Sequence, residues 1–213
     1  DAFGYRVRRV SLVGCCGRPQ ISAGLLDEAR SLVERSAGPL AAELDSSGAV
    51  AMIALEPSCL SALREEWREL ESDVPATTTD RLARASVSIE SFLEERWDVH
   101  PRRPRVSLPD SITVHPHCHA KVDRDHFRKL LDHVGAVDAK VLDSGCCGLA
   151  GSFGYVAEHA DLSKRIFEQS LGATVDDADG GPLVASGTSC RHQCDDLANL
   201  AALHPATLIA RGL

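Results

Sequence analysis

The chain has 213 residues, of which 44% are hydrophobic, so it is long enough to form one large domain or two small ones around a buried core. Acidic residues outnumber Lys and Arg by 31 to 23, giving a formal net charge of −8, which argues against nucleic acid as a partner. The sequence has no run of about eighteen apolar residues, and its opening, DAFGYRVRRV, lacks the apolar segment of a signal peptide. We therefore expect a cytoplasmic protein without a transmembrane segment.

Cysteine usage is the most informative feature of the composition. The chain has 8 cysteines, and in a reducing compartment such clusters more often bind metal or carry out redox chemistry than form disulfides.

The first elements, in chain order, indicate an α/β unit. LLDEARSLVE (25–34) has helical apolar spacing, VAMIAL (50–55) is a buried-strand pattern, and EPSC closes the unit before the helix CLSALREEWREL (59–70). A further helix is expected over 80–97. The prolines and arginines that follow indicate a surface connection.

The second half of the chain repeats this order. The expected strand SITVH leads into HPHCH, and then come the helix ADLSKRIFEQSL, the strand PLVAS, the turn GTSC and another helix from Arg191. Alternating helices and strands predict the α/β class, with short parallel sheets flanked by helices and ligand-bearing loops at the carboxyl edge.

A common offset relates the two halves. Three cysteines, together with their neighbours Gly14, Gly17 and Ser58, recur 131 positions later: Cys15 as Cys146, Cys16 as Cys147, and Cys59 as Cys190. The chain is therefore interpreted as two pseudo-symmetric repeats. The first spans residues 1–96, a connecting loop spans 97–110, and the second spans 111–213.

Cys118 is a fourth cysteine in the second repeat. Its counterpart in the first repeat would lie before Asp1, so the first repeat is N-terminally incomplete and we expect the chain to be a fragment of something longer. A gene sequence with a translation start at or just before Asp1 would contradict this expectation.

The four cysteines of the second repeat predict a metal centre. Cys118, Cys146, Cys147 and Cys190 supply the four thiolates needed for a 4Fe-4S cluster or a tetrahedral zinc site. Adjacent cysteines point in different directions, which suits two vertices of a bulky cluster, whereas structural zinc more often uses cysteines separated by two residues. The pattern favours iron-sulfur.

The residues around these thiols fit a cluster environment. Gly145 and Gly148 are small enough for backbone N–H groups to approach sulfur, and such donors raise a reduction potential. Arg191 and His192 follow Cys190 and could offset negative charge. Cys194 lies one helical turn further on, as a spare ligand or a buried structural thiol.

Two other sets of residues are weaker metal sites. The first repeat keeps three thiols, Cys15, Cys16 and Cys59, so a second centre would either need an upstream ligand or be absent. His115, His117 and His119 alternate, and in an extended strand they would share a face opposite Cys118 without converging. We expect these histidines to be partly exposed or hydrogen-bonded near the cluster.

The motifs resemble a known family. GCCGRPQISAGLLDEAR, LEPSCLSAL, HPHCHAK, SGCCGLAGSFGYVAEH and SGTSCRHQ are similar to the CCG, or cysteine-rich, domain. That domain occurs in the heterodisulfide reductase B subunit, the anaerobic glycerol-3-phosphate dehydrogenase iron-sulfur subunit, lactate-utilisation proteins and the C-terminus of certain FAD-linked oxidases. The last group, of the D-lactate and D-2-hydroxyglutarate dehydrogenase type, fits best.

The resemblance implies the iron-sulfur portion of a flavin-dependent D-2-hydroxy-acid oxidoreductase. Electrons would pass from an upstream FAD-binding domain or subunit through one 4Fe-4S cluster, or two if the first repeat also binds one, to an acceptor. The fragment alone would then not be a catalyst.

Two departures from the family pattern keep alternatives open. Many members close each repeat with CxxC, but Glu56 and Gly187 replace the first cysteine of that pair here. A five-cysteine noncubane cluster is therefore not carried over. The alternatives are a zinc-stabilised structural or interaction module, and a thiol–disulfide redox domain like the heterodisulfide reductases.

Overall fold

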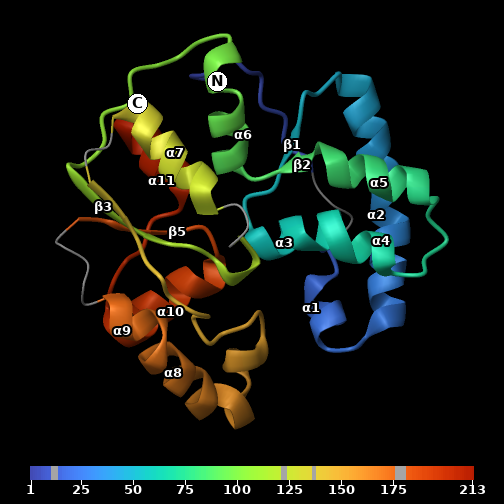
Figure 1. The fold of residues 1–213 in the computed structure, drawn as a ribbon. Helices are drawn as coiled ribbons and strands as arrows, with labels where there is room; N and C mark the ends of the chain where they lie inside the picture. Colours follow the sequence, from blue (N-terminus) through green and yellow to red (C-terminus); the bar gives the residue numbers. More distant parts are fainter. Residues whose placement is uncertain (11–13, 121–123, 136–137, 176–180) are drawn as a thin grey trace. The chain divides into compact units, whose positions relative to one another are not determined.

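Two small parallel sheets organise the chain, one in each half (Figure 1). The computed structural model describes residues 1–10, 14–120, 124–135, 138–175 and 181–213. These divide into two compact units, one formed by Arg6–Ser88 and the other by Asp1–Tyr5 together with Ile89–Leu213. The predicted α/β class, with short parallel sheets flanked by helices, is confirmed in both.

The unit Arg6–Ser88 is mostly helical. Its two strands, β1 (Met52–Ile53) and β2 (Ser86–Val87), pair in parallel. Its helices are α1 (Arg18–Ser22), α2 (Leu26–Ser47), α3 (Pro57–Ser61), α4 (Trp67–Glu69) and α5 (Ala76–Ala85), and a π-helical segment, Ala62–Glu66, joins α3 to α4. Val33, Trp67 and Leu82 are buried at its core.

The expectation of one helix over residues 80–97 is wrong. The structure has α5, then β2, then α6 (Ile89–Glu95). Residues 86–88 read Ser-Val-Ser, which have modest helix propensity, and the Ser86 hydroxyl donates to the Leu82 carbonyl at the helix end. Pairing with β1 then outweighs the helical apolar spacing of the segment.

The other unit contains the larger sheet, in the order β4–β3–β5, with all strands parallel. Its strands are β3 (Ser111–His115), β4 (Asp138–Val141) and β5 (Leu183–Ala185). Its helices are α6, α7 (Arg124–Val134), α8 (Ala160–Gln169), α9 (Leu171–Val175), α10 (Thr188–Ala198) and α11 (Pro205–Gly212). Short 3-10 turns lie at Trp97–Val99, Cys118–Ala120, Phe153–Tyr155 and Ala157–His159.

Helices cover both faces of this sheet. α7 and α11 lie on one side and α8 to α10 on the other (Figure 1). A central parallel strand buried on both faces is expected to be a continuous apolar run, and Ile112 to His115 of β3 are buried. Each fully buried leucine or valine contributes about 1.5–3 kcal/mol. The strands that lead into the cysteine loops are therefore held in place by a packed hydrophobic core.

The repeat is visible in the local backbone. Glu56 and Gly187 are both extended N-cap residues, so Cys59 and Cys190 are each the third residue of their helix. Gly17 and Gly148 both have positive φ, 83° and 93°. The positions separated by 131 residues thus adopt matching conformations. The repeat boundaries themselves stay a prediction, since compactness groups α6 and residues 97–110 with the second repeat.

Candidate metal centre

The carboxyl ends of three neighbouring strands carry the four cysteines of the second repeat. Cys118 lies in the 3-10 turn that follows β3, Cys146 and Cys147 lie in the loop after β4, and Cys190 lies in the first turn of α10, after β5. Parallel strands end at the same edge, so three loops distant in sequence are brought together there.

The four thiols interact in series. Cys118 is hydrogen-bonded to Cys146, Cys146 to Cys147, and Cys147 to Cys190. These hydrogen bonds lower the pKa of Cys146 and of Cys190, while they raise the pKa of Cys118 and of Cys147, which keep the shared protons. Two of the four thiols are thus poised toward the thiolate form that binds metal.

Exposure differs along this series. Cys118 is exposed, Cys146 is half-buried, and Cys147 and Cys190 are only 3% and 1% exposed. Within the described residues, no three His, Cys, Asp or Glu side chains are arranged to hold a single metal ion. The donor set, four thiols from three loops, nevertheless matches in number and chemistry what a 4Fe-4S cluster requires.

The glycines of GCCG keep space for this loop. Gly148 has φ +93° and a Cβ there would lie 2.2 Å from the Ser163 carbonyl oxygen, so no larger residue fits. Its N–H lies 3.4 Å from the Cys146 sulfur and donates to it. At Gly145 a Cβ would lie 2.6 Å from Ser170 Oγ. The expected backbone donor to sulfur is therefore present at Gly148.

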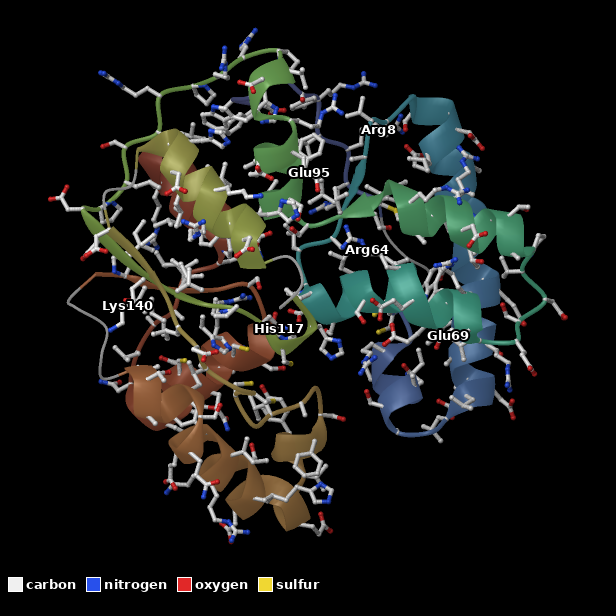
Figure 2. The ribbon with its side chains drawn as sticks, in the orientation of Figure 1. Arg8, Arg64, Glu69, Glu95, His117 and Lys140 are labelled. Carbon is white, nitrogen blue, oxygen red and sulfur yellow. The ribbon has the colours of Figure 1, made fainter. Side chains whose placement is uncertain are left out.

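Two histidines are buried beside the thiols. His115 is 2% exposed, with Nε2 lying 3.3 Å from Cys190 Sγ and Nδ1 lying 2.6 Å from Ser144 Oγ. His117 is 6% exposed and its Nδ1 accepts the His119 N–H at 3.1 Å. Figure 2 shows His117 at the turn that follows β3.

The expected alternation of these histidines along a strand is wrong beyond His115. β3 ends at that residue and a 3-10 turn begins at Cys118, so the rings of His117 and His119 stack, 5.6 Å apart, instead of alternating regularly with Cys118. The turn also brings His117 against Gly187, where a Cβ would lie 2.1 Å from the ring.

The other predicted neighbours of the cluster have defined partners. Arg191 donates to the carbonyls of Ala185 and Ser186 at the end of β5, and the exposed His192 is hydrogen-bonded to the Tyr155 hydroxyl at 2.7 Å. Cys194 is fully buried in the apolar core, and burial raises its pKa to about 12. Its packing favours the structural thiol over the spare ligand.

The first repeat gathers a smaller set of thiols. Cys16 Sγ lies 3.1 Å from Cys59 Sγ, and Cys15 is half-buried next to it. The hydrogen bond between Cys16 and Cys59 raises the pKa of Cys16 and lowers the pKa of Cys59. The indole N–H of Trp67 donates to the Cys16 carbonyl at 2.8 Å and fixes the loop. These are three thiols, one fewer than a cubane cluster uses.

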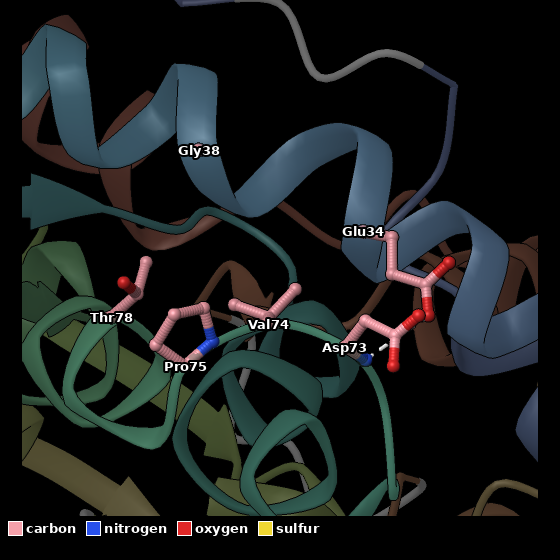
Figure 3. Close-up of a pocket in the computed structure, with 6 residues that line it drawn as sticks. All are labelled: Glu34, Gly38, Asp73, Val74, Pro75 and Thr78. Carbon is pink, nitrogen blue, oxygen red and sulfur yellow. Dashed lines mark hydrogen bonds between the residues drawn. The ribbon is translucent and has the colours of Figure 1, made fainter.

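An open pocket of about 330 Å³ in the same unit is separate from the cysteines (Figure 3). Glu34, Gly38, Asp73, Val74, Pro75 and Thr78 line it. The Glu34 carboxylate accepts the Asp73 N–H at 3.2 Å. The lining has neither cysteine nor histidine, so we assign no redox or metal chemistry to it.

Comparison with known proteins supports the family resemblance. Residues 112–195 match the family model of the cysteine-rich domain, CCG. The matched segment contains all four thiols of the second repeat and also Cys194. The recognition made from the motifs is confirmed for this part of the chain.

Three relatives extend the likeness to most of the sequence. The chain is 27% identical over its whole length to one subunit of the anaerobic glycerol-3-phosphate dehydrogenase of Escherichia coli, and covers 53% of that protein. It is 29% identical over 91% of its length to the D-2-hydroxyglutarate dehydrogenase of Pseudomonas putida, of which it covers 18%. It is also 25% identical over 83% of its length to lactate utilization protein A of Bacillus velezensis, covering 72% of it.

The chain thus spans about half, or less, of the two dehydrogenase sequences. No solved structure matches it. Across the described ranges, none of the helices combines the length and apolar character needed to cross a membrane.

Sequence reasoning missed Ser144 and did not single out His115 from its neighbours. Ser144 immediately precedes GCCG, and His115 ends the apolar run SITVH. A polar residue at the carboxyl end of a buried parallel strand was the available signal. The cysteine that His115 would contact depended on the order of the strands in the sheet, which the sequence alone does not determine.

Proposed function

We propose that this chain is the iron-sulfur electron-transfer portion of an oxidoreductase, and that its second repeat holds one 4Fe-4S cluster through Cys118, Cys146, Cys147 and Cys190. The observation that carries the proposal is the convergence of these four thiols from three loops at one sheet edge, in hydrogen-bonded series. When bound, such a cluster supplies one-electron transfer at a potential that its surroundings set.

The protein's own residues would contribute binding, shielding and access. Cys147 and Cys190 are buried and would keep water from one side of the cluster, while the exposed Cys118 would lie on the side open to an electron donor or acceptor. The Gly148 N–H and the His115 ring supply hydrogen bonds to sulfur. These donors offset the negative charge that four thiolates bring.

The finer proposal concerns the reaction that the chain serves. Two of its relatives are dehydrogenases whose names specify glycerol-3-phosphate and D-2-hydroxyglutarate, and a third is named for lactate utilization. We infer that the chain accepts electrons from an FAD-binding domain or subunit that oxidises a D-2-hydroxy acid, in the cytoplasm. The 213 residues alone would not turn over substrate.

The decisive experiment is anaerobic reconstitution of the chain with ferrous iron and sulfide, followed by counting iron, sulfide and zinc per chain. About four irons with a broad absorption band typical of thiolate-bound clusters supports the proposal, and about eight means that the first repeat also binds a cluster. A colourless protein with about one zinc overturns it in favour of a structural module. Reduction of disulfides without a flavin partner would instead support the thiol–disulfide alternative.

A further inference from the structure

We propose that His115 is a positioning residue that donates a hydrogen bond from Nε2 to the sulfur of Cys190, with Ser144 fixing its tautomer, and thereby raises the reduction potential of the centre. This inference rests on the proposed function, because it assumes that Cys190 is a ligand. The distances are 3.3 Å from Nε2 to Cys190 Sγ and 2.6 Å from Nδ1 to Ser144 Oγ.

The three residues follow the order of the strands. Ser144 lies after β4, His115 ends the central strand β3, and Cys190 lies just after β5. His115 pairs in register with Ala185, the last residue of β5. The hydrogen bonds therefore run across the carboxyl edge of the sheet, and the strand pairing itself holds the imidazole between the hydroxyl and the sulfur.

The donor assignment follows from the chemistry of the partners. A ligating thiolate has no proton, so the imidazole nitrogen that faces it must be the N–H donor. Nδ1 is then the lone-pair nitrogen and accepts the hydroxyl proton of Ser144. All three side chains are at most 4% exposed, so water does not compete for these hydrogen bonds.

The expected consequence is electrostatic. Reduction adds negative charge to the centre and to its sulfur ligands, and an N–H donor in a buried site stabilises the reduced form more than the oxidised one. The imidazole lies against the most buried ligand, where the local dielectric is lowest. Removing the donor should make the centre harder to reduce.

The test is a redox titration of the anaerobically reconstituted chain, followed by absorption and electron paramagnetic resonance, with iron counted for each variant. His115→Leu should make the midpoint potential more negative by ~59 mV for one electron. This shift corresponds to a tenfold change in the ratio of oxidised to reduced centre at a fixed applied potential. Ser144→Ala should shift it in the same direction by less. His115→Gln, which keeps an N–H donor, should recover part of the shift.

His133→Gln is the matched control, because that exposed histidine stacks on Trp97 and was not assigned to the cluster environment. Its potential should equal that of the wild type. If His115→Leu binds about four irons at an unchanged potential, the inference fails while the proposed function stands. If the wild type binds no iron, the proposed function fails first. If His115→Leu does not assemble a cluster, the midpoint potentials of Ser144→Ala and His115→Gln test the inference instead, and potentials equal to that of the wild type in both variants would overturn it.

Discussion

In both repeats the closing cysteine is the third residue of a helix that starts from an extended N-cap, and in both a left-handed glycine follows the cysteine pair. The side chains around this common backbone differ. In the second repeat four thiols interact in series beside two buried histidines. In the first, three thiols lie beside Glu56 and an indole-anchored loop.

The comparison shows that the same loop backbone carries different side-chain surroundings in the two repeats. The first repeat keeps the loop conformation, and Trp67 donates to the Cys16 carbonyl, an anchor whose equivalent position in the second repeat is Ala198. The second repeat has four thiols in hydrogen-bonded series, with the Gly148 N–H and the His115 ring beside them. We expect perturbations at equivalent positions to have unequal effects.

The largest expected effect is loss of metal from one repeat but not from the other. Cys190→Ala removes a proposed ligand and should lower reconstituted iron from about four per chain to near zero. Cys59→Ala, the change at the equivalent position, should leave about four. Iron and sulfide counts on both variants measure this. Loss of iron from Cys59→Ala alone would place the cluster in the first repeat.

The next effect concerns space at the replaced CxxC position. Gly187→Ala puts a Cβ 2.1 Å from the His117 ring and 3.3 Å from Cys190 Sγ, so the ring or the start of α10 must move. We expect a loss of about 1–3 kcal/mol in the free energy of unfolding. Glu56→Ala, the matched control, should cost about 1 kcal/mol or less. Equal costs, measured by denaturant titration, would contradict the argument from packing.

The indole anchor of the first repeat predicts a similar or smaller effect. Trp67→Phe keeps the aromatic packing but leaves the buried Cys16 carbonyl without its donor, at a cost of about 1–3 kcal/mol in unfolding free energy. Alkylation of Cys15 and Cys16 should also become faster as the loop loosens. Trp97→Phe, whose indole stacks on His133 at 5.0 Å, provides the control. Unchanged alkylation rates in Trp67→Phe would count against an anchoring role.

The smallest expected effect is a pH dependence confined to the unit that includes the second repeat. His100 is 8% exposed among Phe3, Tyr5, Phe92 and Trp97, and burial lowers its pKa below the usual 6.5. Its neutral form is satisfied, since Nε2 donates to the Leu93 carbonyl and Nδ1 accepts from Tyr5.

The sign of this effect follows from proton binding. Below about pH 6.5 the unfolded chain binds a proton at His100 that the folded chain does not, so stability falls as the pH is lowered from that value toward the depressed folded pKa. His100→Phe should flatten the dependence of the unfolding midpoint on pH between about 5 and 7. An unchanged slope in this variant would show that other groups cause it.

The sequence predicted much of the site because its signals are local. The offset between the cysteines, the strand SITVH, the helices around residues 160–171 and 191–203, and the glycines of GCCG all appear in the structure near the expected positions. The prediction of one helix over 80–97 was wrong because a strand pairing with β1, remote in sequence, interrupts it.

By itself, the sequence determined the repeat, the α/β class and the set of thiols, since these depend on residue identity and short-range periodicity. Only the tertiary structure decided which histidine reaches a sulfur. The order β4–β3–β5 puts Ser144, His115 and Cys190 side by side, although 29 and 75 residues separate His115 from its two partners. Contacts of this kind are set by strand pairing, which depends on the packing of the whole sheet, and no local pattern encodes it.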